Sequence, residues 1–173
     1  VIVCDFGHGL INKKLAEIIS NKSKSLAINV QTNAGNRGFN LFTKYNKANF
    51  LCLDEPEFRL GFQDKNTNLK QLINRASKKY QDIMITRGIY GLILKKKKKP
   101  IVELAALSRG GVDTMGAGDS AYRYDSVFSK YCKNHKLVSL VAAIAGALKI
   151  KIVGHRKFID IDDIYKSIIT LTK

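Results

Sequence analysis

Residues 113–120 have the sequence DTMGAGDS, the most distinctive functional pattern in the chain. Gly116, Ala117 and Gly118 directly precede an acid, Asp119, and a helical pattern of apolar residues follows. Small residues at a helix N-terminus let its unpaired backbone N–H groups approach an anion closely. A carboxylate there repels phosphate, but it is useful where it takes a proton from an attacking hydroxyl. The alternative is a tight glycine turn with Asp119 as a favourable first-turn acid.

The pattern extends beyond these four residues. The DTxGAGD signature of the ribokinase-like sugar kinases, also called the PfkB carbohydrate kinase family, is matched in order by Asp113, Thr114, Gly116, Ala117, Gly118 and Asp119. Within that family the chain resembles most the sugar-kinase domain of ADP-heptose synthases. This resemblance implies an α/β three-layer sandwich, in which a mostly parallel sheet carries helices on both faces and ends in a β-meander.

The resemblance covers all 173 residues, but only the later, nucleotide-binding portion of the family's fold. The chain is therefore expected to be a single domain, 1–173, without the sugar-binding N-terminal part and the lid. Val1 opens an apolar strand-like run, which also suggests a missing N-terminal segment. The expected partners are that segment, a fused nucleotidyltransferase domain or a second copy of the chain.

The activity implied by the resemblance is ATP-dependent phosphorylation of a sugar or sugar-phosphate hydroxyl, such as that of a heptose 7-phosphate. Asp119 would act as the base, and the backbone N–H groups of residues 116–119 would form the anion hole. Asp113 and Thr114 would help to bind a monovalent cation such as K⁺, as in some family members. Asp5, in the loop DFGHG, corresponds to a family loop near the substrate. A second hypothesis is a catalytically incomplete, nucleotide-binding regulatory or assembly module.

An acidic cluster follows the apolar run at 50–53, with Asp54, Glu55 and Glu57. Carboxylates are costly to cluster unless they face water, a cation or each other. The family has an NxxE motif here, whose acid helps to organise Mg²⁺ and phosphate. Asp54 and Glu57 hold its two positions, so an aspartate replaces the asparagine and adds a negative charge. The alternative is an acidic loop that caps the next helix.

Two further regions resemble nucleotide contacts of the family. Thr86, Gly88 and Gly91 match a Thr-x-Gly-x-x-Gly segment that lines the nucleotide phosphates, although a glycine turn between strands is also common. Ala142 and Gly146 belong to an apolar helix near which the family binds the adenine base. Small residues also suit close helix packing.

The coarse order of elements is βαβαβαβ, then a β-meander, then helices, which predicts a parallel sheet. The helices are expected at 12–22, 39–47, 67–80, 137–150 and 161–172, with a further one from Asp119. In the short helix at 39–47, Phe39, Phe42 and Tyr45 are expected to be core residues. The acidic run at 54–57 is expected to be the loop after a strand.

Composition narrows the class of protein. The formal charge of +16 suits an anionic substrate, and the lysines are spread out except for Lys95–Lys99, so no nucleic-acid partner is expected. A nucleic-acid binder driven by charge is the third hypothesis. No apolar run approaches the roughly 20 residues that span a bilayer, so no membrane association is expected. The three cysteines are far apart in sequence, which predicts reduced thiols and a cytoplasmic location.

Overall fold

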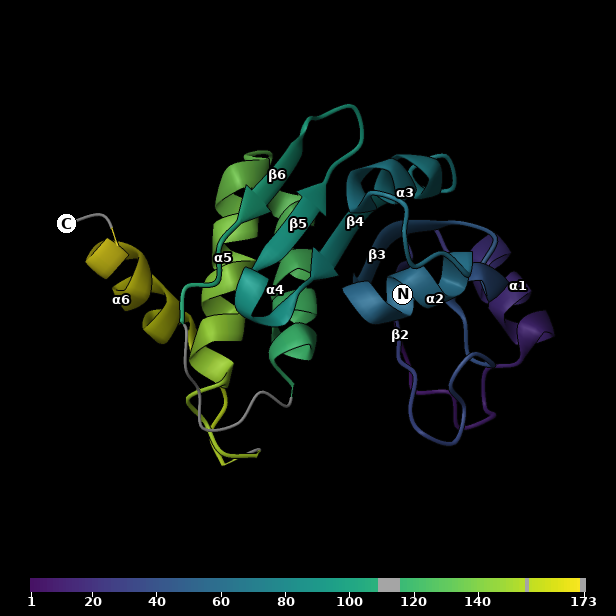
Figure 1. The fold of residues 1–173 in the computed structure, drawn as a ribbon. Helices are drawn as coiled ribbons and strands as arrows, with labels where there is room; N and C mark the ends of the chain where they lie inside the picture. The colour runs from purple at the N-terminus through teal and green to yellow at the C-terminus, as the bar shows by residue number, and fades with distance from the viewer. Residues whose placement is uncertain (109–115, 155, 172–173) are drawn as a thin grey trace. The chain divides into compact units, whose positions relative to one another are not determined.

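The computed structural model describes residues 1–108, 116–154 and 156–171 (Figure 1). Its six strands form one sheet in the order β1-β2-β3-β4-β5-β6. The chain divides into two compact units, Val1–Thr86 with Ile93–Ile101 and Arg87–Leu92 with Val102–Lys173. The expected α/β class, with a mostly parallel sheet flanked by helices, is confirmed.

Parallel strands form the centre of the first unit. They are β1 (Ile2–Asp5), β2 (Ala27–Val30), β3 (Ala48–Asp54) and β4 (Tyr80–Thr86), and each is paired in parallel with the next. All four residues of β2 are buried, as expected of a strand covered on both faces. The helices of this unit are α1 (Lys13–Lys22), α2 (Glu55–Phe62) and α3 (Leu69–Ala76).

Each helix of the first unit starts at a side-chain cap that the sequence supplies. Asn12 accepts from Leu15 N, Asp54 from Glu57 N and Asn68 from Lys70 N. These caps satisfy backbone donors that have no partner inside the helix. The apolar faces behind the caps enter a core that includes Ala16, Phe58, Leu72 and Ile73.

Aromatic side chains fill the middle of this core. Phe42 stacks on Phe58 with ring centroids 5.5 Å apart, and it meets Tyr80 edge-on at the same distance. The Tyr80 hydroxyl donates to the carbonyl oxygen of Tyr45 at 2.8 Å, so the buried phenol is satisfied. Phe42 and Tyr45 are core residues as expected, but the prediction for Phe39 is wrong, because it is 90% exposed.

The second unit is mainly helical. It contains α4 (Ala117–Tyr131), α5 (His135–Lys149) and α6 (Ile161–Leu171), and the short 3₁₀ helix η2 (Gly88–Tyr90). A core of Val141, Ile144, Ala145 and Ile164 joins α5 to α6. The strands β5 (Leu92–Lys95) and β6 (Ile101–Leu104) each contain residues of both units. No helix among the described residues is long and apolar enough to cross a bilayer.

Three element predictions are corrected by the structure. The helix expected over 39–47 is only a 3₁₀ turn, η1 (Phe42–Lys44), because Leu41 and Tyr45 on either side are extended. The acidic run expected as a loop is instead the cap and first turn of α2. Finally, α4 begins at Ala117 rather than Asp119, since Gly116 is its N-cap.

Candidate functional site

The carboxyl ends of the parallel strands bring several predicted site residues to one edge of the first unit. The register pairs Asp5 at the end of β1 with Val30 at the end of β2, and Asp54 at the end of β3 with Thr86 at the end of β4. Open parallel sheets bind ligands outside these ends. The strand topology therefore places Asp5, Asp54 and Thr86 at the edge where a ligand is expected.

Asp54 and Glu57 form a reciprocal capping box at the start of α2. Glu57 N donates to Asp54 Oδ1 at 2.7 Å, and Asp54 N donates to Glu57 Oε2 at 3.3 Å. The other oxygen of Glu57, Oε1, accepts from Thr32 N at 2.8 Å, in the loop after β2. The capping role, given above as the alternative for these acids, is thus present. It fixes both carboxylates at the end of β3.

Burial and mutual repulsion change the acidity of this pair. Desolvation, and next the nearby negative charge of Asp54, raise the pKa of Glu57 to about 7. Desolvation also raises the pKa of Asp54, against the opposing effect of its hydrogen bonds with Glu57. Two carboxylates that resist ionising side by side gain from a cation that neutralises them.

The pair fits part of a magnesium site. Carboxylate oxygens are hard ligands of the kind Mg²⁺ takes, and Mg²⁺ usually keeps several waters beside one or two carboxylates and substrate phosphates. Among the residues that the structure describes, no group of three or more His, Cys, Asp or Glu side chains is placed to hold a metal ion. Asp54 and Glu57 would therefore hold the ion together with water or phosphate.

The two glycines of the predicted phosphate-binding segment after β4 have different surroundings. Gly88 has a φ of +56° and open space where a Cβ would stand. Gly91 has a φ of +83°, and a Cβ there would collide with the backbone carbonyl of Leu104. Thr86, before them, donates from Oγ1 to the carbonyl oxygen of Leu53 at 3.4 Å. Gly91 is thus explained by packing, whereas only Gly88 has room for a ligand.

The glycines of the GAGD pattern lie at the start of α4, as predicted. Gly116 is the N-cap, with a φ of +77° that favours glycine, and as a glycine it supplies no capping side chain. Asp119 lies in the first turn and is half-buried. The N–H groups of Ala117, Gly118 and Asp119 come before the first intrahelical bond, which Ser120 N makes to Gly116 O at 2.9 Å. Asp113 and Thr114 lie outside the described residues.

Of the two predicted adenine-contact residues on α5, Gly146 faces α4 and Ala142 is buried. A Cβ on Gly146 would lie 3.5 Å from the carbonyl oxygen of Ala117, and Ala142 has no exposed surface. Gly146 therefore serves the close packing of the two helices, the alternative given for these small residues above. That packing holds the start of α4 against the last turns of α5.

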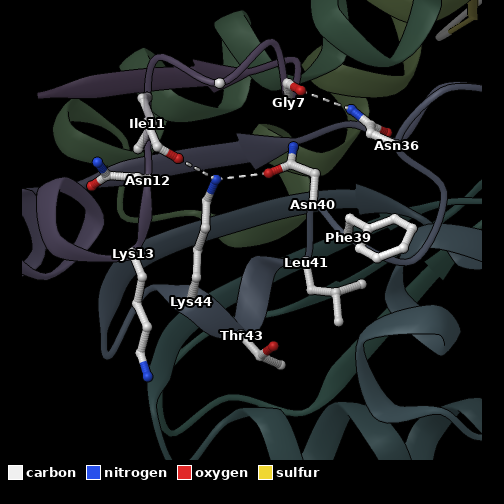
Figure 2. Close-up of a pocket in the computed structure, with 11 residues that line it drawn as sticks. Gly7, Ile11, Asn12, Lys13, Asn36, Phe39, Asn40, Leu41, Thr43 and Lys44 are labelled. Carbon is white, nitrogen blue, oxygen red and sulfur yellow. Dashed lines mark hydrogen bonds between the residues drawn. The ribbon is translucent and has the colours of Figure 1, made fainter.

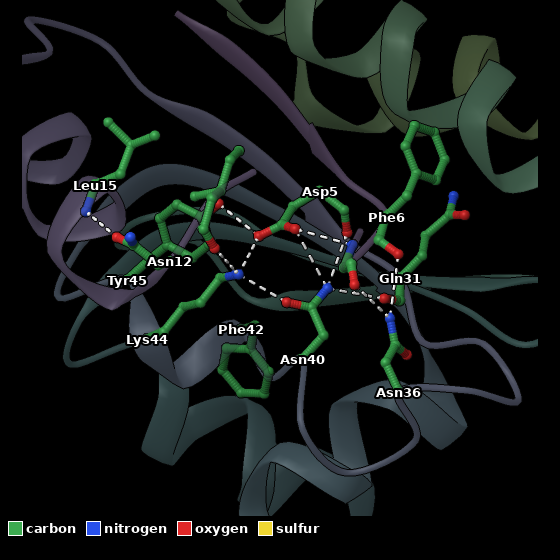
Figure 3. A network of polar contacts seen from close by, with 12 residues as sticks. Asp5, Phe6, Asn12, Leu15, Gln31, Asn36, Asn40, Phe42, Lys44 and Tyr45 are labelled. Carbon is green, nitrogen blue, oxygen red and sulfur yellow. Dashed lines mark hydrogen bonds and ion pairs between the residues drawn. The ribbon is translucent and has the colours of Figure 1, made fainter. Parts of the chain in front are cut away.

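Asp5, expected in a loop near the substrate, is the buried centre of a polar network (Figure 3). Its Oδ2 accepts from the Tyr45 hydroxyl at 2.8 Å and pairs with Lys44 Nζ at 2.6 Å. Its Oδ1 accepts from Gly7 N at 3.1 Å and Asn40 Nδ2 at 3.3 Å. Only 3% of Asp5 is exposed. In this arrangement its carboxylate holds the loops after β1 and β2 rather than presenting itself to a ligand.

A cavity of 530 Å³ opens beside this network (Figure 2). None of the site residues predicted from the sequence lines it. Its polar walls are largely engaged within the protein, because Asn36 Nδ2 donates to Gly7 O at 3.1 Å and Lys44 Nζ donates to Ile11 O and Asn40 Oδ1 at 2.7 Å. The lining is Gly7, Gly9, Ile11, Asn12, Lys13, Asn36, Phe39, Asn40, Leu41, Thr43 and Lys44.

Sequence reasoning missed the partners of Asp5 and a buried lysine, Lys149. Lys44 and Tyr45 lie in a segment read as a core helix, and nothing local marks either as the partner of an acid near the N-terminus. Lys149 was not singled out within the apolar helix expected at 137–150. A single lysine among small and apolar residues at 137–150 was the one available signal.

The fold is shared with solved sugar kinases. Phosphofructokinase-2 from Escherichia coli in complex with potassium aligns with a TM-score of 0.79 at 11% identity, over 99% of this chain and 57% of that one. Ribokinase from Thermotoga maritima aligns at 0.75 and 14%, over 96% and 56%. Ribokinase from Arabidopsis thaliana, complexed with ribose and ATP, aligns at 0.71 and 17%, over 89% and 50%.

The chain thus has the ribokinase-like fold, and it spans about half the length of these structures. No family model and no curated protein sequence matches it. At these identities the likeness concerns the fold alone.

Proposed function

We propose that the chain is the phosphoryl-transfer portion of a carbohydrate kinase that uses ATP and Mg²⁺. The observation that carries the proposal is the start of α4, where Gly116 leaves the helix without a side-chain cap and Asp119 stands in the first turn. The N–H groups of such a terminus have no partner inside the helix, and they attract an anion. The DTMGAGD sequence and the ribokinase-like fold support the same activity.

In the proposed reaction, Asp119 takes the proton of a sugar hydroxyl as its oxygen attacks the γ-phosphorus of ATP. The bond from that phosphorus to the bridging oxygen breaks, and ADP leaves. The N–H groups of residues 116–119 hold the charge on the transferred group. Asp54 and Glu57 would hold Mg²⁺, which offsets the phosphate charge when bound. A heptose 7-phosphate is the proposed acceptor, based on the sequence resemblance.

The test measures ATP turnover by this chain against a panel of sugars and sugar phosphates, including a heptose 7-phosphate. Asp119→Asn is expected to lower kcat by roughly a hundredfold or more, since general-base catalysis contributes about 10²–10⁴-fold. The ATP dissociation constant should change little. Asp162→Asn is the matched control, because Asp162 also lies in the first turn of a helix, α6, and is exposed.

Unchanged turnover in Asp119→Asn would remove Asp119 as the base. Saturable ATP binding without transfer to any acceptor would instead favour the second hypothesis, a nucleotide-binding regulatory or assembly module. A chain that binds no ATP at all would contradict both.

A further inference from the structure

The second unit contains a buried lysine that the proposed reaction does not use. Lys149 is the last residue of α5 and is only 6% exposed. Its ammonium donates to the carbonyl oxygen of Gly154 at 2.6 Å and of Ile152 at 3.5 Å. Within the described part of the chain, no carboxylate forms an ion pair with it. Among the described residues its partners are neutral carbonyls, and burying an ammonium without a carboxylate partner is costly.

The side chain of Lys149 lies against the start of α4. A Cβ placed on Gly116 would be 3.2 Å from Lys149 Cε and 3.9 Å from Nζ. The first turn of a helix carries partial positive charge, so an ammonium beside it is unfavourable when the two are alone. A bound anion reverses the sign of this effect, because both groups then attract it.

The ligands of this ammonium are those of an alkali cation. Backbone carbonyl oxygens are the groups that replace the hydration shell of K⁺ in proteins. The carbonyls of Ile152 and Gly154 follow α5 directly, and they converge on one positive charge beside the glycine that ends the DTMG sequence. In this chain the positive charge belongs to the side chain of Lys149 and not to a free ion.

We propose that Lys149 is a positioning residue whose ammonium, beside Gly116 at the start of α4, takes the place of the monovalent cation that the sequence resemblance implies. The inference rests on the proposed function in one respect, that the anion at the start of α4 is a phosphate of ATP. It predicts that ATP binding by this chain does not depend on K⁺. It also predicts that removing the ammonium creates such a dependence.

The experiment measures the dissociation constant of Mg·ATP by calorimetry, and the Tm without ATP. Each is measured in potassium chloride and in tetramethylammonium chloride of equal ionic strength, because the larger ion cannot fit between the carbonyls. The variants are Lys149→Met, which removes the charge, and Lys149→Gln, which keeps a donor for Gly154 without the charge. Lys151→Met is the matched control, since Lys151 is a nearby exposed lysine.

The wild type and Lys151→Met should give the same affinity and Tm in both salts. In tetramethylammonium, Lys149→Met and Lys149→Gln should bind ATP about tenfold more weakly, as expected for the loss of one nearby charge. Potassium should restore most of that affinity in both variants. It should also raise the Tm of Lys149→Met, whether or not it raises the Tm of Lys149→Gln. If Lys149→Met does not fold, Lys149→Gln decides the outcome.

Two results would overturn the inference. One is a wild type that gains affinity or Tm from potassium as strongly as the variants do. The other is a variant that matches the wild type in tetramethylammonium. If the wild type binds no ATP, the proposed function fails, and the Tm measurements still decide whether Lys149 stands in for a cation.

Discussion

The carboxylates of Asp54 and Glu57 each accept a hydrogen bond from the backbone N–H of the other, at 2.7 Å to Asp54 Oδ1 and 3.3 Å to Glu57 Oε2. The same two side chains therefore cap α2 and bring two acids together at the end of β3. A helix cap and a metal-binding pair are not competing explanations here. The cap holds the carboxylates at the ligand-binding edge of the sheet.

The first prediction concerns the pH dependence of folding. The pKa of Glu57 is raised from 4.5 to about 7 in the folded chain, so between these pH values the folded state binds more protons than the unfolded state. Glu57 therefore stabilises the fold below about pH 4.5, and this contribution is lost as the pH rises through about 7. Urea unfolding measured from pH 4 to 8 should show this loss.

In the same experiment, Asp54→Asn should lower the pKa of Glu57 and flatten the pH dependence, because it removes the negative charge and keeps a good N-cap. Glu55→Gln, on the same helical turn, is the control and should keep the wild-type profile. A profile that Asp54→Asn leaves unchanged would show that the charge of Asp54 does not act on Glu57. The affinity for Mg²⁺ should also fall in Asp54→Asn.

The second prediction concerns the ion pair between Asp5 and Lys44. Asp5→Asn leaves the ammonium of Lys44, only 15% exposed, without its carboxylate. Removing one partner of a buried ion pair typically lowers the free energy of unfolding by about 3–5 kcal/mol. The measurement is the free energy of unfolding of the chain in urea, followed by far-UV circular dichroism.

The double variant Asp5→Asn with Lys44→Met should recover part of that loss, because it no longer buries an unpaired charge. Additive losses in the two single variants would mean that the pair is not energetically coupled.

The third prediction separates two glycines of the segment after β4. Both have positive φ, so alanine at either position should cost about 1–2 kcal/mol in backbone strain. At Gly91 the added methyl also meets the backbone of Leu104, which should cost roughly 1–3 kcal/mol more. Thermal unfolding should therefore rank Gly91→Ala well below Gly88→Ala.

For ATP affinity the order should be reversed, with Gly88→Ala more affected than Gly91→Ala. If Gly88 leaves room for a phosphate, Gly88→Ala should weaken ATP binding in protein that is still folded. Equal stability of the two variants would contradict the packing explanation for Gly91.

The fourth prediction concerns Gly116, with Gly9→Ala as the control. Both residues have positive φ, at +77° and +89°, but only Gly116 has a neighbour within 4 Å, Lys149. Both alanine variants should lose about 1–2 kcal/mol of stability. Only Gly116→Ala should weaken ATP binding, because the methyl displaces the ammonium and covers the start of α4. Equal ATP affinity in the two variants would count against an anion site there.

Much of the fold followed from local patterns. The apolar faces at 12–22 and 67–80 are short-range signals, and helices are present in these segments as α1 (Lys13–Lys22) and α3 (Leu69–Ala76). The glycines before Asp119 likewise predicted a helix start where little side chain covers the backbone N–H groups. Such features depend on hydrogen bonds and side-chain spacing within a few residues, so the order of residues specifies them.

Other features depended on contacts between distant residues. Asp5 was expected in a loop near the substrate, but Lys44, Asn40 and Tyr45 surround its carboxylate. Phe39 was expected in the core, but it lies in the turn before η1 and is exposed. Lys149 gained its meaning only when α5 packed on α4 and brought its ammonium beside Gly116. The sequence alone determined which groups could begin helices and which runs could be buried. The tertiary structure decided which charges are paired, because that depends on the desolvation and close approach that packing creates.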